Sequence, residues 1–230
     1  MYLFLIVFMP VSLLWYLMHE KDKAAIPVAL AGALSGIVFC AFKAFFTFSY
    51  RTPRSGFFVN YAYILLAYTL IPVAAVYLIF LVLSKDDDAF IAKSYFPLLC
   101  AFFSVYVPYT VLSGSRSAYS AFELFCKPVL YTAMLASSAV CVSFLYRTRA
   151  DENRLRTWLA MLIGFLFVPG AIETAWFVGF ASFVWLPFFV LYIFLSACGF
   201  VRFLHGDFPE KTVSIFLPNV YARTHSLHSS

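Results

Sequence analysis

The sequence predicts an all-α fold, a polytopic integral membrane bundle of seven transmembrane helices, and three observations indicate it. First, the chain of 230 residues is 63% hydrophobic and only 12% charged, which is more apolar surface than a soluble domain of this length needs. Second, apolar runs long enough to cross a bilayer recur along the whole chain. Third, these runs lack the short alternating pattern of a transmembrane β-barrel, so in lipid their backbone groups must be satisfied within helices.

The seven predicted spans follow one another with polar connections between them. They cover residues 2–18, 24–48, 57–83, 89–112, 120–146, 157–175 and 182–203. No Lys or Arg precedes the first apolar run, so we expect a retained span and not a cleaved signal peptide. The second span carries Gly32 and Gly36 on one face, a spacing that lets another helix approach closely. We expect this face to pack within the bundle in preference to forming a dimer seam.

The third and fourth spans contain prolines and are separated by an acidic segment. The third span is long enough to be tilted or kinked, and it contains Pro72. Aspartates at positions 86–88 precede the fourth span, where carboxylates stabilise a helix N-terminus. Because adjacent side chains on a helix diverge, we interpret these aspartates as a solvated helix start, and we predict no metal site.

The last two spans are separated by a short turn. Residues 157–203 are too long for one span and just long enough for two, so we place a turn near residues 176–181, which include Gly179. The polar residues 204–230 are expected to leave the membrane. We therefore predict two parts, a transmembrane helix bundle over residues 1–203 and a cytoplasmic C-terminal tail that follows it.

The distribution of positive charge predicts the orientation of the bundle. Eleven of the 16 Lys and Arg residues fall on the side that carries the C-terminus, and five fall on the other side. The positive-inside rule then places the N-terminus outside and the C-terminus in the cytoplasm, in the plasma (inner) membrane. Basic loops beside anionic lipid explain the net charge of +5, so the lipid bilayer is the expected partner and no nucleic acid is required.

Of the charged side chains within the predicted spans, four lie toward the outer ends: Lys43, Glu123, Lys127 and Glu173. Two bases and two acids could therefore converge between the second, fifth and sixth spans. A charge at membrane depth costs about 2.5 kcal/mol or more, so pairing is expected. Glu123 and Lys127 have the favourable i, i+4 order of an acid before a base. The simplest interpretation is snorkelling to the lipid headgroups, and the other two are a structural ion-pair network and a functional site.

As a functional site, these side chains would suit a small charged solute. Lys43 and Lys127 could attract an anion, and either glutamate could bind a proton or a cation. Three further basic residues would steer the solute at the rim: Arg51, Arg54 and Arg116. Helix breaks at Pro128 and Pro169, close to these charges, would free backbone groups of the kind that bind ions in many transporters.

Motifs of enzymes are mostly missing from the sequence. No HExxH, GxSxG or Walker A pattern occurs, and the five cysteines lie in apolar runs without a CxxC, so we predict no cofactor. These features favour a transport component, either a small permease or a membrane substrate-binding subunit, over an enzyme.

One alternative is a membrane-embedded enzyme that acts on lipid or peptide with Glu123 or Glu173 as general base. Another is a non-catalytic scaffold subunit whose Gly32 and Gly36 face binds other membrane subunits.

Overall fold

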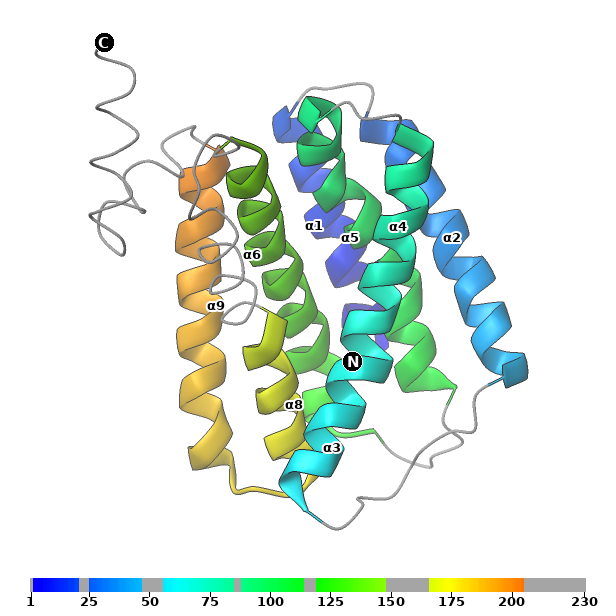
Figure 1. Cartoon of the computed structure of the whole chain (residues 1–230). Helices are drawn as coiled ribbons and strands as arrows, with labels where there is room; N and C mark the ends of the chain where they lie inside the picture. The colour runs from blue at the N-terminus through cyan, green and yellow to red at the C-terminus, as the bar shows by residue number, and fades with distance from the viewer. Residues whose placement is uncertain are drawn as a thin grey trace.

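The computed structural model of the chain describes residues 2–20, 25–46, 56–84, 88–113, 119–147 and 166–204. Within these ranges all regular elements are helices, and they form one bundle (Figure 1). The helices are α1 Tyr2–Glu20, α2 Ala25–Phe46, α3 Phe57–Ile64, η1 Leu65–Leu70, α4 Ile71–Ser84, α5 Asp88–Leu112, η2 Phe122–Cys126, α6 Lys127–Arg147, α8 Val168–Phe177 and α9 Ser182–Leu204. The segments η1 and η2 are π-helical, so α3 to α4 and η2 to α6 are two continuous helices with a widened turn.

Five helical segments are long and apolar enough to cross a membrane, which supports the prediction of a membrane helix bundle. They are Ala25–Ala44, Phe57–Val76, Ser94–Leu112, Phe122–Cys141 and Ser182–Val201. The helix Tyr2–Met18 is apolar but shorter. The outward faces of α2 and α9 point large apolar side chains away from the bundle, among them Leu34 at 64% and Phe183 at 79% exposed. Such faces are unfavourable in water and favourable against lipid.

The structure allows most of the predicted helix ends to be compared. The first five predicted spans match described helices, and α9 matches the seventh. The turn predicted near residues 176–181 is confirmed: α8 ends at Phe177, α9 begins at Ser182, and Gly179 between them has a φ of 89°, which glycine adopts without strain. The start of the sixth predicted span, most of the basic loop and the C-terminal tail lie outside the described residues.

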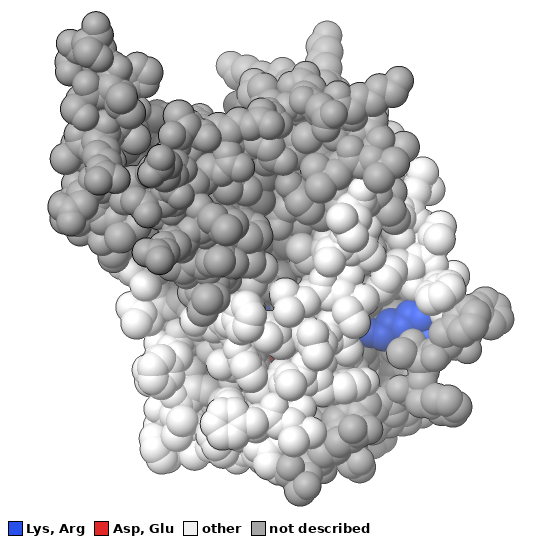
Figure 2. Space-filling model, in the orientation of Figure 1, with Lys and Arg blue, Asp and Glu red and all other residues white. Residues whose placement is uncertain are grey.

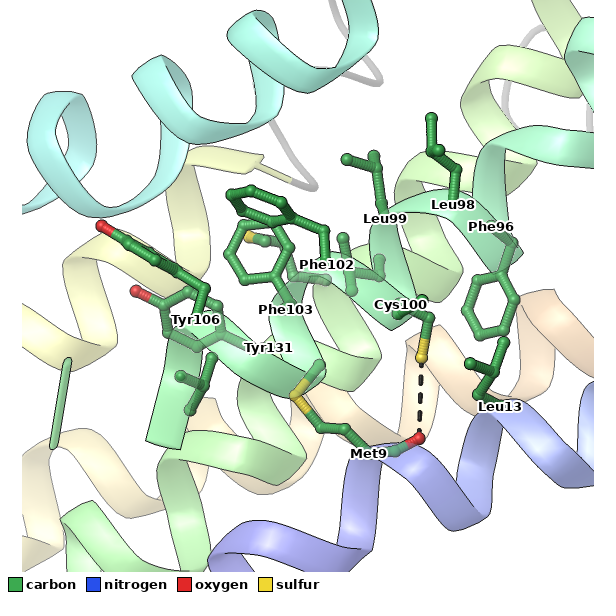
Figure 3. Close-up of a cluster of buried hydrophobic side chains, with 14 of the residues drawn as sticks. Met9, Leu13, Phe96, Leu98, Leu99, Cys100, Phe102, Phe103, Tyr106 and Tyr131 are labelled. Carbon is green, nitrogen blue, oxygen red and sulfur yellow. Dashed lines mark hydrogen bonds between the residues drawn. The ribbon is translucent and has the colours of Figure 1, made fainter. Parts of the chain in front are cut away.

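Helix α5 forms the centre of the bundle. Phe102 and Phe103 on α5 are fully buried, together with Met134 of α6. Figure 3 shows α5 side chains packed against α1, where the Cys100 thiol donates to the backbone carbonyl oxygen of Met9 at 3.7 Å. The apolar core thus accounts for the cohesion of the helices on every side of α5.

Gly32 and Gly36 allow α2 to lie directly on α5. A Cβ atom at Gly32 would overlap the backbone carbonyl group of Leu98, and one at Gly36 would lie 2.9 Å from the carbonyl oxygen of Phe102. The small-residue face predicted from the sequence is therefore occupied by a helix of the same chain. A partner helix could reach these two glycines only by displacing α5.

Each π-helical segment ends shortly before a proline. The segment η1 ends two residues before Pro72, η2 ends two residues before Pro128, and the π-helical residues 166–167 end two residues before Pro169. A proline has no N–H, and its ring crowds the carbonyl group of the preceding turn, which a wider turn relieves. The breaks expected at Pro128 and Pro169 are thus widened turns followed by regular helix.

Candidate functional site

Among the residues whose side chains the structure describes, four are charged: Lys43, Glu123, Lys127 and Glu173. They are the four candidates predicted from the sequence. Lys127 and Glu173 are buried, whereas Lys43 is partly exposed. Figure 2 accordingly shows a face whose described surface is almost entirely uncharged, with one basic patch. Two of the four charged side chains that the structure describes are thus buried inside the bundle.

Lys127 and Glu173 form a buried salt bridge between α6 and α8. The Lys127 Nζ atom lies 2.7 Å from Glu173 Oε1, and their side chains are 10% and 7% exposed. The second carboxylate oxygen, Oε2, accepts a hydrogen bond of 3.0 Å from the Tyr131 hydroxyl group. A buried carboxylate is tolerated when it is paired and its oxygens are hydrogen-bonded, and both conditions are met here.

Glu123 caps the N-terminus of its own helix. Its Oε2 atom accepts hydrogen bonds from the backbone N–H of Ser120 at 3.0 Å and from the Ser120 hydroxyl group at 3.1 Å. In return, the Glu123 N–H donates to Ser120 Oγ at 3.2 Å, which completes a reciprocal capping box. The sequence spacing had suggested a pair between Glu123 and Lys127, but Lys127 bonds to Glu173. Glu123 belongs to the π-helical turn η2, which ends one residue before Lys127, so the α-helical i, i+4 geometry does not apply to them.

Lys43 approaches the same region from the end of α2. Its Nζ atom donates to the Tyr106 hydroxyl group at 2.7 Å and lies 4.3 Å from the centroid of the Tyr68 ring. The Lys127 Nζ atom lies 5.2 Å from the same Tyr68 centroid, so both ammonium groups contact one aromatic ring. Lys43 also interacts electrostatically with Lys127 and Glu173. We call these three residues, Lys43, Lys127 and Glu173, the charge cluster.

A proline in α4 helps to build the site. The Ile71 N–H donates to the carbonyl oxygen of Leu66, five residues back, as in a π-helix. The next bond of this kind would run from residue 72 to Ala67, but Pro72 has no N–H. The Ala67 carbonyl oxygen instead accepts a hydrogen bond of 3.2 Å from Tyr106, the tyrosine that contacts Lys43. The widened turn thereby supplies an acceptor that holds Tyr106 in place.

The two residues after Ala67 also reach the charge cluster. Tyr68 places its ring against both lysines, and the buried Thr69 hydrogen-bonds to Tyr131, the tyrosine that contacts Glu173. Figure 3 shows the hydroxyl groups of Tyr106 and Tyr131 pointing to the same side, away from the apolar core. The η1 turn is therefore linked to both lysines of the cluster through tyrosines.

The structure brings three of the four sequence candidates together and adds residues that the sequence analysis missed. Tyr68, Tyr106 and Tyr131 were not predicted, since the chain contains 15 tyrosines and the sequence does not distinguish these three from the rest. The position of Tyr131, one turn after Lys127, is a signal that could have identified it. The predicted rim residues Arg51, Arg54 and Arg116 lie outside the described residues. Within the described ranges, no three His, Cys, Asp or Glu residues gather as a metal site would require.

Comparisons of the chain with protein-family models, curated proteins and solved structures give no match. The function therefore has to be inferred from the chemistry of the charge cluster. That chemistry consists of two ammonium groups, one carboxylate and three tyrosine rings at one end of a membrane bundle. Such a group of side chains can bind an anion by charge and by hydrogen bonding.

Proposed function

We propose that the protein is a membrane-transport component, a small permease or a membrane substrate-binding subunit, whose charge cluster binds an anionic solute. The observation that carries the proposal is the approach of two ammonium groups from different helices to one aromatic ring. Lys43 of α2 and Lys127 of α6 both contact the Tyr68 ring, and Lys127 is also paired with Glu173 of α8. Charged groups at membrane depth are costly, so two cations held this close together favour a binding role over a packing role.

The proposal includes a seven-span topology with the N-terminus outside and the C-terminus in the cytoplasm, in the plasma (inner) membrane. The described helices alternate in direction along the chain, and the first and last of them, α1 and α9, run in the same direction, which supports an odd number of crossings (Figure 1). The charge cluster lies near the ends of α2 and α8 and at the start of α6, which all lie at the same end of the bundle. The positive-inside rule assigns this end to the outside, so the solute would enter the cluster from there.

The enzyme alternative has less support from the contacts. Both carboxylate oxygens of Glu173 already accept hydrogen bonds from donors, one of them charged. Glu173 could take a proton from a substrate only after one of these donors had left, so its contacts suit an electrostatic role better than proton abstraction. Glu123 is similarly engaged by Ser120.

Uptake into proteoliposomes tests the proposal. The purified protein is reconstituted, and uptake is measured for radiolabelled chloride, phosphate, propionate and succinate. We expect uptake of at least one of these anions, with a loss of about tenfold in Lys43→Gln and in Lys127→Gln, because each removes a charge-assisted contact. Glu123→Gln is the control, since glutamine also completes a capping box. If both lysine variants take up and bind these anions as well as the natural chain does, the charge cluster is excluded as the binding site.

A further inference from the structure

An apolar groove runs between α1 and α9, and no residue of the charge cluster lines it. Its floor is α6, which packs against both of these helices and lies between them in Figure 1. The groove has a volume of about 390 Å³, within the range of about 300–1,000 Å³ that is typical of ligand sites. Four side chains form the floor at helical spacing, and all but the first are small: Val129, Thr132, Ala133 and Ala136. The small floor side chains leave the space that larger ones would fill.

The chemistry of the lining identifies the kind of molecule that fits. No charged side chain lines the groove, and the lining hydroxyl groups belong to Ser12 and Thr132. Each of these hydroxyl groups donates a hydrogen bond of 2.9 Å to a backbone carbonyl oxygen one turn earlier in its own helix. The other lining side chains are aliphatic or aromatic. The groove therefore offers a ligand mainly van der Waals contact, which suits a hydrocarbon chain.

The groove is short and closed at one end. Tyr16 of α1 and Phe200 of α9 meet there with ring centroids 6.1 Å apart, and Phe96 of α5 packs against them at 4.7 and 4.9 Å. The lining residues fall within 8–15 of α1, 129–136 of α6 and 193–200 of α9, which is about 10 Å along each helix. A partner helix that crossed the bilayer would need a continuous seam of about 30 Å, and the aromatic contact interrupts it. A flexible acyl chain needs no such seam.

We infer that this groove binds an acyl chain of a phospholipid from the surrounding bilayer. All its lining residues fall within the apolar helical segments, so it faces the hydrocarbon core. Lipid tails are as apolar as the groove, so the preference for this site comes from packing, since a chain here regains contacts that the small floor side chains leave unmade. The groove has no charged side chain to hold the carboxylate of a free fatty acid, whereas a phospholipid keeps its headgroup at the membrane surface. This lipid site is independent of the proposed anion site.

Native mass spectrometry of the purified full chain tests the inference. The protein is delipidated in detergent, dioleoyl-phosphatidylcholine is added, and the lipid that stays bound after removal of the detergent is counted. We expect the natural chain to retain one phospholipid. Ala136→Leu fills the groove from its floor and should lower this occupancy by about tenfold, because the leucine takes the contacts of the acyl chain. Ala31→Leu is the matched control, since Ala31 is exposed on α2, which does not line the groove, and it should retain lipid as the natural chain does.

A second substitution fills the groove from its wall, in case the floor variant does not fold. Ala197 of α9 lines the groove and is exposed, so Ala197→Leu has room for its side chain and should lower lipid occupancy in the same way. Thermal unfolding gives an independent measurement. A ligand that binds only the folded protein stabilises it by mass action, so added phospholipid should raise the Tm of the natural chain and of Ala31→Leu more than that of Ala197→Leu.

Three outcomes would overturn the inference. Equal retention of phospholipid by the natural chain and both groove variants would show that the bound lipid is not in the groove. Oleate that displaces the phospholipid at equal concentration would assign the groove to a free fatty acid. A mass of two chains that is lost in Ala197→Leu would show that a second copy of the protein occupies the groove in place of lipid.

Discussion

Lys127 and Glu173 are 46 residues apart in the chain, and their side chains meet at 2.7 Å inside the bundle. This contact joins the first residue of α6 to the middle of α8. Because both groups are buried, the contact matters for stability as well as for the proposed function.

Removing one member of this pair should destabilise the fold strongly. Glu173→Leu leaves the Lys127 ammonium group buried without its carboxylate, and breaking a buried pair in this way costs about 3–5 kcal/mol. Lys127→Met/Glu173→Leu removes both charges, so we expect it to recover most of that loss. Denaturant unfolding in detergent micelles measures the difference. Equal instability of the single and double variants would show that the two charges do not depend on each other.

Tyr131 should affect both stability and binding through its hydrogen bond to Glu173. Tyr131→Phe removes that bond, and a hydrogen bond to a charged group contributes about 1.5–3 kcal/mol. Tyr192→Phe is a matched control, since Tyr192 is also buried and hydrogen-bonds Ser137 and Ser196 between α6 and α9. We expect both variants to unfold more easily but only Tyr131→Phe to change anion uptake in proteoliposomes. A change of uptake in Tyr192→Phe of the same size would indicate a general loss of structure.

The capping box of Ser120 and Glu123 should contribute to stability alone. Ser120→Ala removes the hydroxyl group that both donates to Glu123 and accepts from its N–H, and loss of such a cap costs about 1 kcal/mol. We expect a lower unfolding midpoint with unchanged anion uptake. A loss of uptake in Ser120→Ala would place this helix start within the site.

The sequence was sufficient to predict the helices because their signal is local. Apolar runs and polar interruptions gave the ends of the described helices closely, and a glycine between two apolar runs marked the α8 to α9 turn. The choice of four charged candidates was equally local, since a charge in an apolar run stands out. These features depend on neighbours in sequence and need no knowledge of packing.

The sequence predicted less well which charged side chains pair within the site, because pairing depends on how the helices pack. The i, i+4 rule indicated Glu123 as the partner of Lys127, but Ser120 offered Glu123 two donors at the helix start. The actual partner, Glu173, is set by how α6 and α8 pack. The π-helical turns also shift residues around the helix axis, so that regular α-helical spacing no longer identifies which side chains meet.

The glycine contacts between α2 and α5 give a prediction about packing. Gly32→Ala introduces a Cβ atom that overlaps the Leu98 carbonyl group, so the helices must separate, and overpacking of this kind costs about 1–3 kcal/mol. Gly199→Ala in α9 meets nothing within 4 Å, and an alanine in a helix interior is favourable by up to about 1 kcal/mol. Thermal unfolding in micelles should therefore move in opposite directions for the two variants. A Gly32→Ala protein as stable as the natural chain would contradict the close approach.

Pro72 should be needed for the site although it touches none of its charges. Pro72→Ala restores an N–H that can donate to the Ala67 carbonyl oxygen, which now accepts from Tyr106. We expect the helix to become more regular and Tyr106 to lose its anchor, so that Lys43 is held less firmly and anion uptake falls several-fold. Pro187→Ala removes a helix-interior proline from α9, a helix that supplies no residue of the charge cluster, and it should leave uptake unchanged. Equal uptake by Pro72→Ala and the natural chain, with both variants folded, would show that the η1 turn does not position Tyr106 for binding.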